Sequence, residues 1–77
     1  MDDHDILGRV SSLVDEEHRL RSGGPMDDDG RRRLAAIEVQ LDQCWDLLRQ
    51  REGRRDAGED PDQAHVRPPG EVEGYLQ

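Results

Sequence analysis

With 77 residues, of which 31% are hydrophobic and 39% charged, the chain has room for one domain and little material for a core. Chains below roughly 70–80 residues seldom gain enough stability from one core, and oligomerisation is a usual remedy where disulfides and metal sites are lacking. The net charge of −8 argues against non-specific binding to nucleic acid and to anionic membranes, since both require cationic side chains.

Cysteine usage and the first residues indicate the compartment. One cysteine, Cys44, cannot form a disulfide within the chain and is typical of a reducing environment. No apolar run reaches the roughly 18 residues needed to span a membrane. The acidic start, MDDHDIL, lacks the basic region of a secretory signal. We therefore expect a cytoplasmic protein without a membrane segment.

The first predicted element is a helix over residues 3–21. Aspartates at its start can cap it and favour the positive end of its dipole, and arginines suit its other end. Glu17 interrupts its apolar face, and either pairs with an arginine across an interface, fixing the register, or marks the open end of a hairpin. The apolar face consists of Ile6, Val10, Leu13 and Leu20, widened by Leu7 and Val14.

The segment SGGP at residues 22–25 predicts a turn, in which glycine supplies a left-handed C-cap and proline prevents the helix from continuing. Asp27 is the expected N-cap of a second helix over residues 28–56. So short a linker makes the two helices antiparallel neighbours. Gly53 weakens the second helix by about 1 kcal/mol relative to alanine, and Gly58 is the expected stop.

The second helix carries a narrow apolar stripe with the spacing of a coiled-coil seam. The only tryptophan, Trp45, lies beside it. This helix is longer than the first, so either a second copy or the tail should cover the excess. The stripe and its flank give the predicted interface, which consists of Leu34, Ile37, Leu41, Cys44, Trp45 and Leu48.

Residues 59–77 form an acidic tail that contains three of the four prolines and cannot be one continuous helix. Asp60 and Pro61 can open one short helical turn, and residues 65–69 have the composition of an extended or polyproline II segment. We therefore divide the chain into a helical hairpin, residues 1–58, and a mostly irregular tail, residues 59–77.

Four stretches of the chain have distinctive sequences. They are residues 12–18 (SLVDEEH), residues 38–51 (EVQLDQCWDLLRQR), residues 57–62 (AGEDPD) and residues 66–69 (VRPP) with Val72 and Glu73 after them. Together they resemble a family of short actinobacterial proteins known only as a domain of unknown function. The resemblance extends over nearly the whole chain and implies a bacterial cytoplasmic protein. It implies no activity, cofactor or catalytic residue.

Acidic and histidine side chains near the end of the first helix suggest a metal site. Asp15 and His18 have the carboxylate-x-x-His spacing by which helices of a bundle bind paired metals. The chain supplies this motif once, so a symmetric dimer would have to double it. We favour the alternative that these are solvated charges, because short motif matches are weak evidence. The candidate ligands are Glu16, Glu17, His18 and Asp42.

Cys44 is either a redox-sensitive thiol or, as we favour, an inert buried side chain, because reactive thiols need exposure and a positive neighbourhood. Two arginine clusters, residues 31–33 and 49–55, could bind phosphate or nucleic acid. Pairing with the acidic first helix and tail is the better interpretation, because the chain carries surplus acid. No Gly-rich phosphate loop, zinc spacing or Ser/His/Asp set is present, so we predict no cofactor and no enzyme activity.

The sequence predicts an all-α protein, an antiparallel hairpin that dimerises into a four-helix bundle. Its expected function is that of a non-enzymatic protein-interaction or regulatory module, with a metal-binding bundle or a redox switch through Cys44 as alternatives. An unknown protein partner would be bound by a helix face and the tail, because the tail resembles a docking peptide. The residues expected to bind it are Arg49, Arg51, Tyr75 and Leu76.

Overall fold

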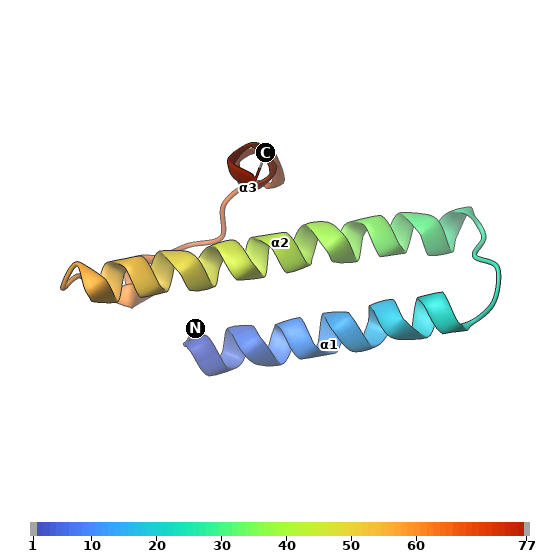
Figure 1. Cartoon of the computed structure of the whole chain (residues 1–77), viewed down its shortest axis with the longest axis horizontal. Coiled ribbons are helices and arrows are strands. Elements are labelled where there is room, and N and C mark those ends of the chain that lie inside the picture. The colour runs from blue at the N-terminus through green and yellow to red at the C-terminus, as the bar shows by residue number, and fades with distance from the viewer. Residues whose placement is uncertain (1, 77) are drawn as a thin grey trace.

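Two long antiparallel helices lie side by side and form a hairpin (Figure 1). The structure is a computed structural model that describes residues 2–76, with side chains described as far as residue 72. Helix α1 (Asp3–Ser22) and helix α2 (Asp28–Asp56) are followed by a single 3-10 turn, η1 (Pro61–Gln63), and by helix α3 (Pro69–Leu76). The predicted all-α hairpin is confirmed, and α1 ends one residue later than we expected.

Both long helices begin where local capping chemistry places them. The Asp2 carboxylate accepts the backbone N–H of Asp5 at 2.8 Å, and the Asp5 carboxylate accepts that of Asp2 at 3.3 Å. At the start of α2, Asp27 accepts the N–H of Gly30 at 2.8 Å. Each contact satisfies a backbone donor that the first turn of a helix leaves without a partner, so the starts of α1 and α2 can be predicted from sequence.

The turn between the helices contains a left-handed glycine, as the SGGP segment predicted. It is Gly24, with a φ of 91°, whereas Gly23 has a φ of −82°. Beyond α2, Gly58 has a φ of 75° and its N–H reaches the Arg55 carbonyl at 3.1 Å. The helix therefore stops at the glycine that we expected to stop it.

Two glycine substitutions should have opposite effects. Gly53 lies inside α2 with open space where a Cβ would stand, so Gly53→Ala should stabilise the protein by about 1 kcal/mol. Gly58→Ala should destabilise it by about 1–2 kcal/mol, because a left-handed backbone puts Cβ against the following carbonyl oxygen. Urea unfolding of both variants measures the difference, and an equal effect at both positions would contradict the left-handed stop.

The core lies in the seam between α1 and α2, with one correction to the predicted stripe. Leu34, Leu41 and Leu48 are only partly buried, whereas the neighbouring Leu47 is buried. The reason is that the tail covers α2 on the side of Leu47, so the buried face of α2 is shifted from the predicted stripe toward that side. The buried members of the seam are Ile6, Val10, Leu13, Ile37, Cys44 and Leu47.

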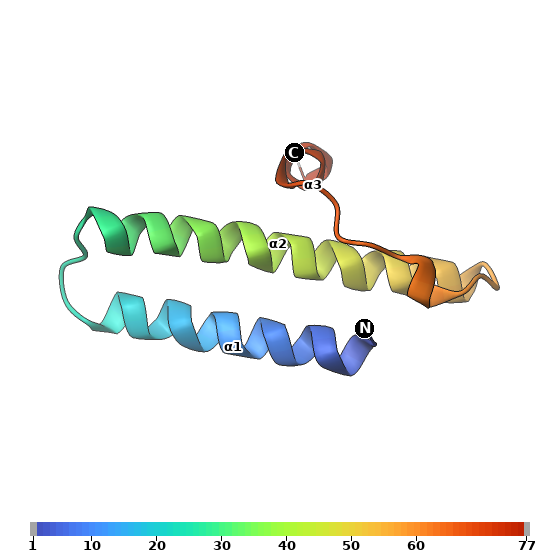
Figure 2. The same cartoon turned by 180° about the vertical axis from the view of Figure 1, so that it is seen from behind.

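The tail folds back over the end of α2 (Figure 2). Of the two expected covers for the part of α2 that extends beyond α1, a second copy or the tail, the tail lies there. The short turn at Asp60 and Pro61 is confirmed as η1. Helix α3 was not expected, because Pro68 and Pro69 indicated extended chain. Proline is well suited to the first position of a helix, where its missing N–H costs nothing, and α3 begins at Pro69.

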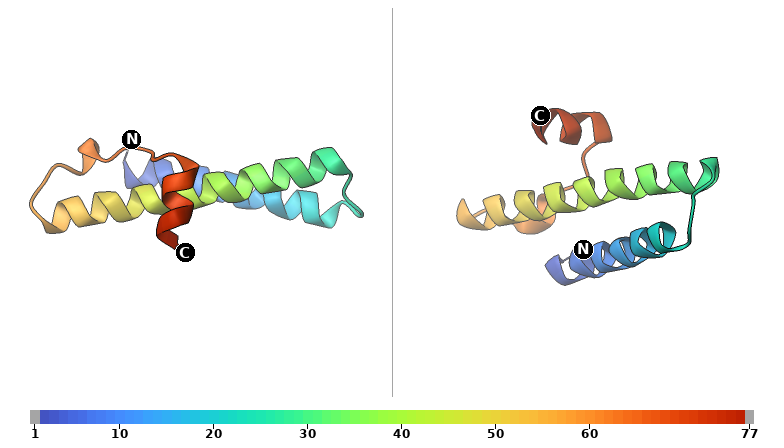
Figure 3. Two further views of the ribbon diagram at one scale, coloured as in Figure 1. Left: turned by 90° about the horizontal axis from the view of Figure 1, so that it is seen from above. Right: turned by 45° about the vertical axis from the view of Figure 1, so that its right-hand side comes forward.

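Helix α3 runs across α2 rather than along it (Figure 3). Its Val72 is fully buried and anchors it. Within residues 2–76, no helix combines the length and the apolar character that crossing a bilayer requires.

Candidate functional site

The hairpin has two flanks, which can be told apart by the contacts between its helices. On one flank Arg33 pairs with Glu16 at 2.5 Å. On the same flank, about two helical turns before Glu16 on α1, Arg9 donates a hydrogen bond to Gln40 at 3.4 Å. Each helix residue is rotated by about 100° from the one before it. Leu7, Val14 and Trp45 therefore lie beyond the packed faces on the other flank.

Exposed apolar side chains gather on that other flank. Leu7 is 48% exposed, Val14 44% and Trp45 46%. The register set by the paired residues brings Leu7 to within about one helical turn of Trp45. The ion pair of Arg21 with Glu38, at 3.4 Å, lies on the same flank. We name Leu7, Val14 and Trp45 the apolar flank. Val14, expected in the core, is exposed there because it lies about 80° around α1 from Ile6.

Two opposite charges stand on either side of Trp45. Asp42 precedes it by three residues and Arg49 follows it by four, so both lie on the same side of α2 as the ring. Asp42 is partly buried and Arg49 is exposed. Arg49 also lies close enough to Asp46 to contribute to the lowered pKa of that carboxyl. Along α2, this flank therefore presents an acidic side chain, then the Trp45 ring, then a basic side chain.

Arg51 does not belong to an outward surface, which corrects its predicted role in binding a partner. It is only 6% exposed, and its guanidinium contacts Asp3 at 2.6 Å and Asp62 at 2.9 Å. It also donates to the Pro61 carbonyl at 3.2 Å. Hydrogen bonds from Arg55 and Arg51 lower the pKa of the Asp3 carboxyl. Arg51 thus fastens both the start of α1 and η1 to the end of α2.

A second buried charged side chain, Asp46, binds the tail to α2 at another point. Asp46 is 3% exposed and accepts from Arg67, at 2.8 Å from Nε and through a second contact from the other guanidinium nitrogen. Gln50 donates to the same carboxylate at 2.9 Å. These donors, Arg67 first, lower the pKa of Asp46 although burial opposes the shift. We call Asp46, Gln50 and Arg67 the tail clamp.

Backbone carbonyls of the tail extend the clamp. Gln43 donates to the carbonyl of Arg67 at 3.1 Å, and Gln50 donates to that of His65 at 2.8 Å. Sequence reasoning missed these residues. The available signal was the polar series Gln43, Asp46 and Gln50, spaced by three and four on α2, together with the lone arginine of an acidic tail.

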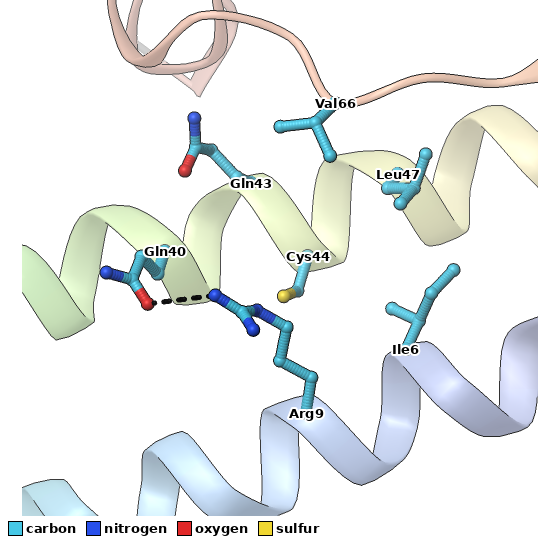
Figure 4. A pocket seen from close by; sticks show the side chains of 7 residues that line it. All are labelled: Ile6, Arg9, Gln40, Gln43, Cys44, Leu47 and Val66. Carbon is cyan, nitrogen blue, oxygen red and sulfur yellow. Dashed lines mark hydrogen bonds between the residues drawn. The ribbon is translucent and has the colours of Figure 1, made fainter. Parts of the chain in front are cut away.

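Cys44 lies buried in the seam, as we favoured. Burial raises the pKa of its thiol, although the nearby Arg9 acts in the opposite direction. The thiol therefore stays protonated at neutral pH. It forms part of the wall of a pocket of about 200 Å³ on the flank opposite Trp45 (Figure 4).

The candidate metal ligands do not come together. Glu16 is paired with Arg33, which lowers the pKa of its carboxyl. Glu16 lies opposite Arg33 on α2. Asp42 follows Arg33 by nine residues, so it lies about 13 Å further along that helix. His18 is exposed. Among the described residues, no group of three or more histidine, cysteine or acidic side chains could hold a metal ion.

The predicted interface residues divide into two sets. Ile37 and Cys44 are used inside the hairpin, whereas Leu34, Leu41 and Leu48 are partly buried and Trp45 remains exposed. Of the residues predicted to bind a partner, Arg49 is exposed. Tyr75 and Leu76 lie in α3, but their side chains are outside the described part of the chain.

The chain has relatives that match nearly all of it and whose names state no activity. The chain is 47% identical over 78 residues to Uncharacterized protein Rv0898c of Mycobacterium tuberculosis and to Uncharacterized protein Mb0922c of Mycobacterium bovis, covering 96% of this chain and 90% of each relative. No solved structure matches it. The family model described as Protein of unknown function (DUF2630) matches residues 2–77, so the chain belongs to the DUF2630 family.

Proposed function

We propose that this protein is a non-enzymatic helical interaction module that works as a homodimer, joined through the apolar flank. The observation that carries the proposal is Trp45, the only tryptophan, left 46% exposed on the flank where Leu7 is also exposed. Tryptophan is enriched among the residues that contribute most to protein interfaces. The chain is only 31% hydrophobic, and yet its largest apolar side chain is left exposed to water, which indicates an interaction surface.

The charges around Trp45 favour a second copy as the occupant of this flank. In a two-fold dimer the same patch meets itself, so each contact occurs twice. If α2 packs antiparallel on α2 of the partner with the axis at Trp45, Asp42 of each chain meets Arg49 of the other. The acid, ring, base order along α2 is therefore complementary to itself. Two hairpins joined in this way make a four-helix bundle.

The same packing would cover apolar side chains that are partly exposed to solvent in the isolated hairpin. Leu34 and Leu41 are partly buried on the side of α2 that turns toward Trp45. Their burial adds roughly 25 cal/mol per Å² of apolar area removed from water. The interface would then include three residues predicted from sequence, Leu34, Leu41 and Trp45. We further propose a cytoplasmic location, because the single cysteine is kept as a buried thiol.

A charge exchange tests the dimer. Sedimentation equilibrium at micromolar concentration should give twice the mass of 8.8 kDa. Asp42→Arg alone should weaken association at least about tenfold, because two like-charge contacts with Arg49 then form across the axis. The double variant Asp42→Arg/Arg49→Asp should restore it, since the pattern becomes self-complementary again.

Asp15→Arg is the matched control, because it makes the same charge change on an exposed position of α1 away from both packed faces. It should leave the association constant unchanged. A wild-type protein that stays folded at 8.8 kDa at every concentration would refute the proposal. So would a double variant as weak as the single one, because the two charges would then not face each other.

A further inference from the structure

The flank opposite Trp45 carries a partly enclosed pocket of about 200 Å³ (Figure 4). It is bounded by α1, by α2 and by the extended segment of the tail. Ile6, Leu47 and Val66 supply apolar walls, from these three elements in turn, and the polar lining consists of Arg9, Gln40, Gln43 and Cys44. Ligand pockets have this composition, mostly apolar with a few polar groups that orient the ligand.

Arg9 places a positive charge at this pocket without a negative one to balance it. Its side chain rises from α1 to end beside Cys44 and Gln40 (Figure 4). Its hydrogen bond to the Gln40 Oε1 is long, at 3.4 Å, and that acceptor is neutral. Among the described residues no ion pair includes Arg9, although the chain has 19 acidic residues and pairs many of its other arginines.

The Arg9 guanidinium is a donor at this pocket that suits a carboxylate. It carries several N–H groups, and its hydrogen bond to the Gln40 Oε1 uses one of its nitrogens. A guanidinium binds a carboxylate strongly because the hydrogen bonds are charge-assisted. The oxygens of a ligand carboxylate can therefore accept from Arg9.

We propose that this pocket binds a small monocarboxylate with a ring or a branched hydrocarbon group. The carboxylate contacts Arg9, and the apolar group enters between Ile6, Leu47 and Val66. The volume sets the size, since an apolar cavity of about 150 Å³ accepts a benzene ring. Phosphates and sugars lack the apolar group that would enter between these three side chains. The site lies on the flank opposite the proposed dimer contact and does not depend on it.

Benzoate is the probe, because it carries one ring and one carboxylate. Added to the full chain, it should shift the methyl signals of Ile6, Leu47 and Val66 in carbon-proton NMR spectra, with a Kd on the order of 1 mM. Acetate lacks the ring and benzyl alcohol lacks the charge, so each should bind about tenfold more weakly or not at all.

Three variants distinguish recognition of the carboxylate from filling of the pocket by an apolar group. Arg9→Gln removes the charge from an exposed side chain and should weaken benzoate binding about tenfold. Arg19→Gln makes the same change on α1 away from the pocket and should have no effect. Val66→Phe should block binding by filling the pocket with its own ring.

Three outcomes would overturn the proposal. Benzyl alcohol binding as tightly as benzoate would show that the pocket recognises apolar groups without regard to charge. Benzoate binding unchanged in Arg9→Gln would show that the anion is held elsewhere. The absence of any saturable shift with benzoate would show that the pocket does not take this class of ligand.

Discussion

Replacing Ile37 by alanine should remove about 3–4 kcal/mol from the free energy of unfolding. Ile37 is fully buried in the seam, so Ile37→Ala loses the transfer energy of the deleted carbons and leaves a cavity that two stiff helices cannot close. A chain of this length is expected to have a total stability of roughly 4–12 kcal/mol. The variant should therefore lose a large part of it and melt well below the wild type, as followed by circular dichroism.

Ile37→Val and Val66→Ala are graded controls for this substitution. Ile37→Val removes one methylene and should cost about 0.5–1.5 kcal/mol. Val66 is 56% exposed, so Val66→Ala should change stability little. All unfolding curves need the same protein concentration, because association stabilises the folded state by mass action. If Ile37→Ala cost no more than Ile37→Val, the seam around Ile37 would not be what holds the hairpin together.

The helices could be predicted closely because the signals that begin and end them are local. Asp2 and Asp27 cap by accepting backbone donors three residues away, and Gly58 ends α2 through its own backbone angle. The seam was predicted from a spacing that is also local. Ile37 and Cys44 met that expectation, because they lie on the side of the stripe nearest to Leu47, which is the buried side of α2.

Leu47 shows where a periodic pattern stops being sufficient. A seam between two helices buries a narrow stripe, and Leu47 lies beside that stripe rather than in it. It is buried because Val66 and the returning tail meet α2 on that side. The route of the tail depends on contacts between residues far apart in the chain, and no short spacing encodes those contacts.

The charged residues were the hardest to assign for the same reason. Arg51 was expected both to contact a partner and, as part of an arginine cluster, to pair with the acidic first helix and tail; it pairs with Asp3, which is 48 residues away. Asp46 and Arg67 are 21 residues apart. In a chain with 11 arginines and 19 acidic residues, many pairings satisfy the overall charge, and only the folded arrangement selects among them.

Replacing Asp46 by alanine should release the tail while the hairpin stays helical. Asp46 is almost fully buried and is the carboxylate to which Arg67 and Gln50 donate. Losing hydrogen bonds to a charged group costs about 2 kcal/mol. Asp46→Ala should therefore expose Val72, which NMR detects as a shift of its methyl signals toward those of an unfolded peptide.

Glu52→Ala is the matched control for the tail clamp. Glu52 is an exposed acid on the same helix, six residues further on, so its replacement should leave the Val72 signals in place. If Asp46→Ala unfolded α1 and α2 together with the tail, the clamp would be part of one cooperative unit with the hairpin.

The pH dependence of tail docking follows from the direction of the Asp46 shift. Its pKa is lowered in the folded chain, mainly by Arg67, from an ordinary aspartate value of about 3.9. A lowered pKa means that the carboxylate stabilises the fold above the ordinary value, and that this contribution disappears as the pH falls through the folded pKa. Docking of Val72 should therefore be constant from neutral pH to about pH 5, weaken below about pH 4 and be lost as the pH falls through the lowered pKa.

Asp46→Asn separates this clamp from the other acids. The pKa values of Asp3 and Glu16 are also lowered by arginines, so the hairpin itself should lose stability over the same acidic range. In Asp46→Asn the Val72 signals should already resemble those of the released tail at neutral pH, and should no longer respond separately to acid. A variant whose tail still detaches only below pH 4 would place the responsible carboxylate elsewhere, with Asp62 beside Arg51 as the next group to replace.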